Sequence, residues 1–243
     1  MKRTLILTAI LLASCAVAGW RGQFDEAFAA ASSAWTPARL NPVAWYKGED
    51  NAQDSAGAFD GTWSGTAAYA DGVAGRAFSF AGGNLVSAAD NAALRPANLT
   101  VATWIYQDGG AQQADPSAVG KHSNYKIQVS SDGKLSTTLY PGGARTYIAK
   151  NITLPVGWTH VAMTYDGSAG VVYTNGALLA SKAMSGANTT AGRALGIGYD
   201  SYSTARYFRG MLDDVLIFNR ALTAAEVKKL YDETVKRNGR EWQ

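Results

Sequence analysis

From about Asn41 onward, apolar residues recur at every second position, in short runs separated by turn residues. Tyr125, Ile127 and Val129 form one such apolar face, and the turn residues 131–133 lead into the next run. Side chains alternate between the two faces of a strand, so this period of two predicts β-strands. Many short strands with turns about every 8–12 residues are typical of a sandwich or a barrel.

Two segments add detail to this pattern. The run 99–106 is apolar, aromatic or threonine throughout, which predicts a strand covered on both faces. Asn175-Gly176 is the strongest hairpin signal, because a type I′ turn needs two residues with positive φ. Further strands are expected at 135–139, 161–165, 171–173, 195–198 and 211–218.

A helix is predicted near the C-terminus. Thr223 and Glu226 have the spacing of a capping box, which satisfies free backbone amides at a helix start. Val227, Leu230 and Tyr231 then form an apolar stripe with helical spacing. We expect this helix to pack on the edge of the β domain.

Composition supports a globular β protein. Hydrophobic residues make up 47% of the 243-residue chain, which is enough for a sizeable core. Charged residues make up only 17%. The formal net charge is +3, and two of the positive charges are Lys2 and Arg3. The nearly neutral remainder has no electrostatic footprint for nucleic acid or for an anionic membrane.

The N-terminus has the pattern of a signal peptide over residues 1–18. Lys2 and Arg3 precede an apolar stretch, 5–12, that is too short to span a bilayer. Ala16-Val17-Ala18 is a site for ordinary signal peptidase, which predicts a secreted protein.

Residues 12–15, Leu-Ala-Ser-Cys, offer a second interpretation of the cleavage site, because they resemble the bacterial lipobox. Cys15, the only cysteine, would then carry a lipid and anchor the protein at the cell surface or outer membrane. A third alternative is that the segment is retained as an apolar helix in an assembly. Neither cleaved form has a disulfide, so core packing or a metal must stabilise it.

Residues 19–40 differ in pattern from the β-type sequence that begins near Asn41. Phe24, Ala27 and Phe28 have helical spacing, but the Ala/Ser run and Pro37 favour a linker. We therefore expect a linker or short docking helix at 19–40, one β domain at 41–236 and a polar tail at 237–243.

An ordered series of motifs runs through the predicted β domain. They are GEDNAQDSAG at 48–57 with DGT at 60–62, GRAFSF at 75–80, WTHVAMTYDG at 158–167 with YTNG at 173–176, and FRGMLDDVLIFNRALT at 208–223. The series resembles the laminin-G-like, or concanavalin A-like, domains of bacterial, phage and extracellular proteins. Ala81 departs from it, because the family usually has Asp there. The resemblance implies an antiparallel jelly-roll sandwich with one C-terminal helix, a fold that hosts many unrelated functions.

Asp213 and Asp214 are adjacent in a predicted strand, so one of them must carry a carboxylate toward the core. An unpaired buried charge costs several kcal/mol, so a cation or a hydrogen-bonded network must compensate. Glu49, Asp50 and Asp54 lie in a Gly/Asn-rich loop and offer the hard oxygen ligands that calcium prefers. The resemblance implies a structural calcium between this loop and the Asp-Asp-Val strand. These five residues are therefore the candidate ligands.

The acidic residues have an alternative interpretation. Asp213 and Asp214 would then accept hydrogen bonds from backbone amides or pair with Arg209 or Arg220. The loop acids would simply be solvated. Asp60 is left out of the ligand set, because the family often has His or Asn at that position.

No familiar catalytic pattern is present, so we expect a protein that is not an enzyme. Glucanases of related fold carry an E-x-D-x-E strand that places two carboxylates across the glycosidic bond, and the chain lacks that spacing. His160 lies within a predicted strand, and His122 lies in a loop. The sequence 61–65, Gly-Thr-Trp-Ser-Gly, does not fit the nucleophile elbow G-x-S-x-G.

Three loops combine aromatic and polar residues suited to stacking on sugar rings and hydrogen bonding to them. The sequence therefore favours a non-catalytic exported module that binds a glycan or a protein. One alternative is a structural or assembly protein of a phage virion or cell envelope that docks through residues 20–39. Another is a polysaccharide hydrolase or lyase without a recognisable motif. The candidate ligand-binding residues are His122 and Tyr125 in the first loop, Tyr140 and Tyr147 in the second, and Tyr202 and Arg206 in the third.

Overall fold

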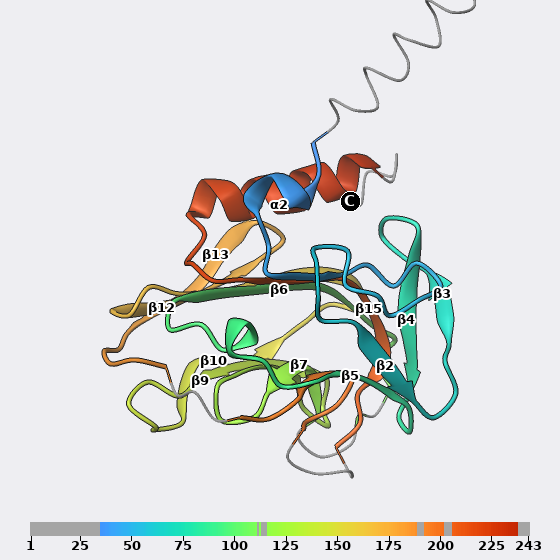
Figure 1. The fold of residues 1–243 in the computed structure, drawn as a ribbon, viewed down its shortest axis with the longest axis horizontal. Coiled ribbons are helices and arrows are strands. Elements are labelled where there is room, and N and C mark those ends of the chain that lie inside the picture. Colours follow the sequence, from blue (N-terminus) through green and yellow to red (C-terminus); the bar gives the residue numbers. More distant parts are fainter. Residues whose placement is uncertain (1–34, 111, 113–115, 189–191, 202–205, 238–243) are drawn as a thin grey trace, which may run out of the picture. The chain divides into compact units, whose positions relative to one another are not determined.

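Two antiparallel sheets lie face to face in the computed structural model, which describes residues 35–110, 112, 116–188, 192–201 and 206–237 (Figure 1). Sheet A contains β1 (Ala44–Tyr46), β3 (Tyr69–Asp71), β4 (Arg76–Ala81), β6 (Leu99–Gln107), β11 (Gly157–Tyr165), β12 (Ala169–Thr174), β13 (Ala177–Ala183) and β15 (Arg209–Phe218). Sheet B contains β2 (Gly61–Ser64), β5 (Leu85–Ala88), β7 (Ser117–Lys121), β8 (Tyr125–Val129), β9 (Lys134–Leu139), β10 (Thr146–Thr153) and β14 (Leu195–Ile197). The helices are η1 (Pro37–Leu40), η2 (Ala92–Leu94) and α2 (Ala224–Arg237).

The strand order is that of a jelly roll. Sheet A runs β13-β12-β11-β6-β15-β4-β3, with β1 beside β15, and sheet B runs β10-β9-β8-β7-β14-β5-β2. Strands distant in sequence are therefore neighbours, as where β15 pairs with both β6 and β4. The predicted fold class, an all-β sandwich with one C-terminal α-helix, is confirmed.

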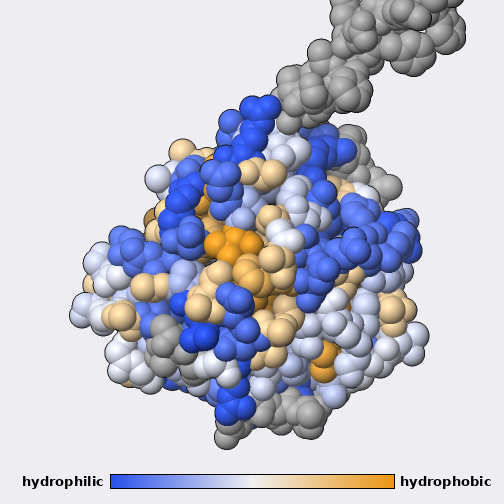
Figure 2. Space-filling model, in the orientation of Figure 1, coloured by the Kyte–Doolittle hydropathy of each residue, from blue (hydrophilic) through white to orange (hydrophobic). Residues whose placement is uncertain are grey.

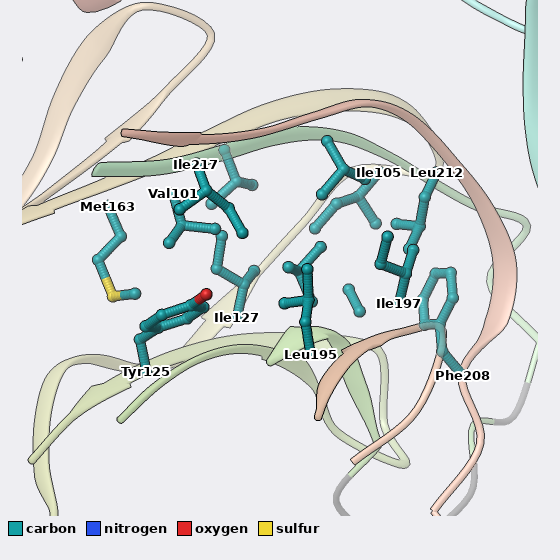
Figure 3. Close-up of a cluster of buried hydrophobic side chains, with 14 of the residues drawn as sticks. Val101, Ile105, Tyr125, Ile127, Met163, Leu195, Ile197, Phe208, Leu212 and Ile217 are labelled. Atoms are coloured by element: carbon teal, nitrogen blue, oxygen red, sulfur yellow. The ribbon is translucent and has the colours of Figure 1, made fainter. Parts of the chain in front are cut away.

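The core fills the space between the sheets. From sheet A, Val101, Ile105 and Ile217 point toward Tyr125 and Ile127 of sheet B (Figure 3). All five side chains are buried. Residues of one strand in this set are separated by two or four positions, which agrees with the period of two that predicted the strands.

The strand β15 changes partner in its middle. Its first half, up to Leu212, pairs with β4, and its second half, from Val215, pairs with β1. The register with β6 shifts between Asp213 and Leu216, and Asp214 has φ of 48°. This bulge breaks the alternation of faces, so Asp213 and Asp214 are both buried.

The helix α2 begins as predicted. The amide of Glu226 donates to Thr223 Oγ1 at 3.2 Å, and the amide of Thr223 donates to Glu226 Oε2 at 2.8 Å. The expectation that it packs on the edge of the domain was wrong: it lies over the outer face of sheet A (Figure 1). Tyr231 stacks on Trp104, with ring centroids 5.4 Å apart. Because Trp104 belongs to β6, in the middle of sheet A, this contact places the helix over the face of the sheet and not at its edge.

Residues 37–243 form one compact unit. In the orientation of Figure 1, the surface is mostly hydrophilic, with a small hydrophobic patch near its centre (Figure 2). Among the described residues, no helix is long and apolar enough to cross a bilayer. The signal peptide at 1–18, Cys15 and most of the segment 19–40 lie outside the described residues, so export and lipidation stay predictions.

Candidate functional site

Asp213 is held by the turn that joins β3 to β4. Its Oδ2 accepts hydrogen bonds from the amides of Val73 at 2.7 Å and Ala74 at 3.0 Å. A Cβ placed on Gly72 would lie only 2.5 Å from this oxygen, so the turn needs glycine there. The other oxygen, Oδ1, is buried without a hydrogen-bond partner among the described residues. Burial, and next the charge of Asp214, raise the pKa of Asp213 well above its ordinary value.

Asp214 and Asp54 join β1 to its surroundings. Asp214 accepts a hydrogen bond from the indole of Trp45 at 2.6 Å and pairs with Arg237 of α2. Asp54 accepts from the amides of Trp45 and Ala56, at 2.8 and 2.9 Å, and from that of Phe59 at 3.2 Å. Both carboxylates are therefore engaged by protein donors. The alternative pairing of the two strand acids with Arg209 or Arg220 was wrong, because those arginines bind Asp108 and Glu226.

Glu49 and Asp50 are exposed, and both contact Arg76, the residue after the turn 72–75. Glu49 Oε2 accepts from the amide of Arg76 at 3.0 Å, and Asp50 pairs with the Arg76 guanidinium at 3.3 Å. A Cβ on Gly75 would lie 2.3 Å from Glu49 Oε1, so the Glu49 carboxylate touches the turn that also holds Asp213.

The five candidate calcium ligands therefore divide into two groups. Glu49 and Asp213 fit calcium, because both reach the turn 72–75 and Asp213 Oδ1 is unpartnered. Asp50, Asp54 and Asp214 fit it poorly, since protein donors already bind their carboxylates. No three His, Cys, Asp or Glu side chains converge as a metal cluster in the part of the chain that the structure describes. A cation at this turn would need backbone oxygens as well.

A second polar site lies on the outer face of sheet B. In β8, Tyr125 and Ile127 point into the core, so Lys126 and Gln128 point the other way. Lys126 and Gln128 are nevertheless almost fully buried, because loops fold over this face. The three loops with aromatic and polar residues lie next to it, at 121–125, at 140–147 and, in the part of the third loop that the structure describes, at 200–201 and 206–207.

Asp200 connects two of these loops to the sheet. Its Oδ2 lies 2.5 Å from Lys126 Nζ and 3.7 Å from an Arg206 guanidinium nitrogen. Its Oδ1 lies 3.2 Å from His122 Nδ1, and the Tyr140 ring lies 6.4 Å from the His122 ring. Burial, and next the charge of Lys126, lower the pKa of His122. The network fixes the start of the loop 199–207.

Beside this network, a small cavity opens at the edge formed by β8, β9 and β10. Its volume is about 60 Å³. Arg145 donates a hydrogen bond to Gln128 at 3.2 Å and lies 4.8 Å from the Tyr147 ring centroid. The Lys150 ammonium lies 4.8 Å from the same centroid. The lining residues are Gln128, Ser130, Ser136, Arg145, Tyr147, Lys150 and Asn151.

The structure brings together four of the six predicted ligand-binding residues. His122, Tyr140 and Arg206 surround Asp200, and Tyr147 lines the adjacent cavity. Tyr125 is a correction: its ring is fully buried in the core and its hydroxyl donates to the carbonyl of Leu94, so it cannot contact a ligand. Tyr202 lies outside the described residues.

Lys126, Gln128 and Lys150 were not among the residues predicted from the sequence. Lys126 and Gln128 alternate with core residues of β8, a signal that marks the outer face but does not show that loops cover it. Lys150 reaches the cavity because β10 has register shifts between Tyr147 and Ala149 and between Ala149 and Ile152. No sequence pattern predicted these register shifts.

Solved structures of similar fold include a domain bound to an oligosaccharide and the binding domains of toxins. Domain 4 of AbnA, a GH43 extracellular arabinanase from Geobacillus stearothermophilus, in complex with arabinotriose, is 24% identical with a TM-score of 0.65, over 79% of this chain and 98% of that one. The binding domain of Paraclostridial Mosquitocidal Protein 1 is 19% identical with a TM-score of 0.63, over 79% and 52%. That of botulinum neurotoxin DC in complex with SialylT is 13% identical with a TM-score of 0.63, over 80% and 51%. The chain thus matches about half the length of the two toxin domains, and these likenesses show the fold.

No curated protein matches the sequence significantly. The family model of the concanavalin A-like lectin/glucanases superfamily, Laminin_G_3, matches residues 80–228, which is more than half of the chain. This protein belongs to the laminin-G-like branch of the concanavalin A-like lectin/glucanase superfamily.

Proposed function

We propose that the protein is a non-catalytic module that binds a glycan through the outer face of sheet B, with the cavity beside Tyr147 at the centre of the contact. The observation that carries this proposal is the convergence of Tyr140, Arg145 and Tyr147 with His122 and Arg206 on that face. Aromatic, amide and cationic groups around a small hollow are the groups that orient sugar hydroxyls and acidic substituents.

The comparisons are compatible with a glycan ligand and with a protein ligand. The structure of AbnA domain 4 contains arabinotriose, and its similarity spans nearly that whole domain. A protein ligand has its own support, because one botulinum binding domain was solved with rat synaptotagmin II. The polar lining of the cavity favours a sugar, because its side chains can form hydrogen bonds with sugar hydroxyls at the rim. We further propose that the module acts outside the cell, as the signal-like residues 1–18 indicate.

Replacing Tyr147 with alanine is expected to weaken glycan binding about tenfold or more, because it removes a wall of the cavity and the ring that holds two cations. The measurement is affinity electrophoresis and calorimetry against a panel of polysaccharides, with the melting temperature of each variant recorded. Tyr106→Ala is the matched control, because Tyr106 is a half-buried tyrosine on sheet A that packs on Trp158. Equal affinity in wild type and Tyr147→Ala, or no binding to any glycan, contradicts the proposal.

We also propose a structural calcium beside the turn 72–75, held by the carboxylates of Glu49 and Asp213 together with backbone oxygens. The unpartnered, buried Asp213 Oδ1 supports it, because a cation would satisfy an oxygen that the protein leaves without a donor. Such an ion would join the Glu49 loop to β15 and so stabilise the sandwich.

Chelation of calcium from the wild type is expected to lower its melting temperature by several degrees, about what a 1 kcal/mol loss causes. Asp213→Asn keeps an oxygen for the amides of Val73 and Ala74 but removes the charge, so it should abolish the response to chelator. Asp132→Asn, which changes an exposed acid in the turn between β8 and β9, should leave the response intact. Identical melting curves of the wild type with calcium and with chelator would refute the proposal, and Asp213 would then be held as the neutral acid.

A further inference from the structure

Two cations line the cavity beside Tyr147 without an acidic partner. Arg145 donates a hydrogen bond to the neutral amide of Gln128, and Lys150 contacts the Tyr147 ring. Neither forms an ion pair within the described ranges 35–110, 112, 116–188, 192–201 and 206–237. The charge of a surface arginine or lysine is usually balanced by ions from the solvent. Here the two side chains line the same cavity, so their positive charges act together.

The local backbone explains the convergence. In a regular strand Tyr147 and Lys150 would point to opposite faces, since they are three residues apart. The two register shifts in β10 remove that alternation, and both side chains line the cavity together with Asn151. The amide of Asn151 donates to Ser136 Oγ at 3.2 Å, which fixes the irregular segment on β9.

The Tyr147 ring holds the cations and does not offer an open platform. Both charges lie 4.8 Å from its centroid, within the range of a cation–π interaction. A neutral sugar that binds by stacking needs a free ring face. The geometry here instead brings two positive charges, both on exposed residues, to the same ring.

The surroundings add positive potential. Lys126 and Arg206 share the single carboxylate of Asp200, so this neighbouring group is itself cationic. Asp132 follows the lining residue Ser130 by two positions. It accepts a hydrogen bond from Ser130 at 2.5 Å and pairs with Lys134 at 2.6 Å, so its charge is already balanced. An anion entering the cavity therefore meets an excess of positive charge.

The size of the cavity limits what enters it. A volume of about 60 Å³ holds a few waters or one small charged group, because a single water needs roughly 10–15 Å³ by this measure. A whole sugar ring is too large. The arrangement suits a carboxylate or sulfate substituent that enters the cavity while the ring stays on the rim.

We propose that Arg145 and Lys150 form a subsite for the anionic group of an acidic sugar, which makes the ligand a uronate-, sialate- or sulfate-bearing glycan. The inference rests on the proposed function and specifies its ligand class. The Arg145 guanidinium supplies the planar fork that grips two oxygens, and Lys150 supplies a point charge.

The experiment compares pairs of probes that share a sugar backbone and differ in charge. They are polygalacturonate with its highly methyl-esterified form, dextran sulfate with dextran, and sialyllactose with lactose. We expect the wild type to bind at least one charged member about tenfold or more tightly than its neutral partner, with affinity that falls as salt rises. Polyglutamate, a polyanion without sugar, should bind no better than the neutral probes.

Three variants locate the effect. Arg145→Gln and Lys150→Gln should each reduce affinity for the charged probe about tenfold, and Arg145→Lys should retain part of it. Lys182→Gln removes an equal charge from the exposed strand β13 of sheet A and should change nothing.

The outcomes separate this inference from the proposed function. Tighter binding of the neutral probes that is lost in Tyr147→Ala but unchanged in Arg145→Gln and Lys150→Gln overturns the acidic ligand and leaves the glycan module standing. If polyglutamate binds as tightly as the charged glycans, the conclusion that the ligand is a sugar is wrong. Failure of every probe, charged and neutral, overturns the proposed function and this inference with it.

Discussion

Asp200→Asn is expected to lower the free energy of unfolding by about 3–5 kcal/mol, the cost of leaving a buried charge without its partner. Asp200 and Lys126 are 1% and 2% exposed, so water cannot replace the lost contact. Burial already lowers the pKa of Lys126 in spite of the adjacent carboxylate. Without that carboxylate the ammonium has to deprotonate, or the loop above it has to open. Urea denaturation followed by tryptophan fluorescence measures the change.

Two comparisons identify the cause. Asp108→Asn breaks the exposed pair with Arg209 and should cost less than about 1 kcal/mol, since solvent screens it. Adding Lys126→Met to Asp200→Asn removes the stranded charge and should restore much of the loss. If Asp200→Asn is no more destabilising than Asp108→Asn, the network around Asp200 does not hold this face together.

Asp200→Asn is also relevant to glycan binding, because Asp200 holds chain segments next to the proposed binding face. Asp200 lies just after β14, where the amide of Phe208 donates a hydrogen bond to the carbonyl of Gly198 and the amide of Asp200 donates one to the carbonyl of Arg206. Gly198 has φ of +80°, and a Cβ there would lie 2.3 Å from the Phe80 ring, so the chain can turn back only at glycine. Asp200 therefore connects Arg206 and the turn at Gly198 to the buried Lys126, beneath the proposed binding face.

Much of the fold could be predicted from the sequence, because its signals are local. Alternation in strands such as β8 reflects burial of one face, and the pair Thr223 and Glu226 satisfies free amides whatever the rest of the chain does. The position of α2 was not predictable in this way. It depends on Trp104 and Tyr231 meeting across the molecule, which no local pattern encodes.

The candidate sites were predictable only in part, for related reasons. Alternation alone would place Asp213 and Asp214 on opposite faces, but the exchange of partners along β15 requires a bulge that buries both. Tyr125 had two interpretations from the sequence, as the end of a polar loop and as the first residue of an apolar strand face, and the second is correct. Lys150 joins its cavity only through the register shifts of β10. Irregular backbone, more than residue type, decides these sites.

Stability is expected to fall as the pH drops from about 6.5 to 4, because His160 is buried as the neutral imidazole. The ring lies between Trp104, 5.3 Å away, and Tyr231 of α2, 6.1 Å away, and its Nδ1 has no hydrogen-bond partner among the described residues. Burial lowers the pKa of His160 from 6.5 to about 4. The folded state therefore binds fewer protons than the unfolded one across this range. The stabilisation is complete above pH 6.5 and is lost toward pH 4, by roughly 3 kcal/mol.

The contribution of His160 is isolated by difference, because other groups titrate in the same range. The raised pKa of Asp213 acts in the opposite sense: its neutral form is favoured in the folded state, so it adds stability as the pH falls. His122, the other histidine, also has a lowered pKa, and both groups are common to wild type and variant. His160→Phe keeps an aromatic ring between Trp104 and α2 but cannot take up a proton. Its free energy of unfolding, subtracted from that of the wild type at each pH, should change by about 3 kcal/mol between pH 6.5 and 4. If this difference in the free energy of unfolding does not change with pH, His160 accepts a proton without disturbing α2. Burial of the ring would then not destabilise the fold at low pH.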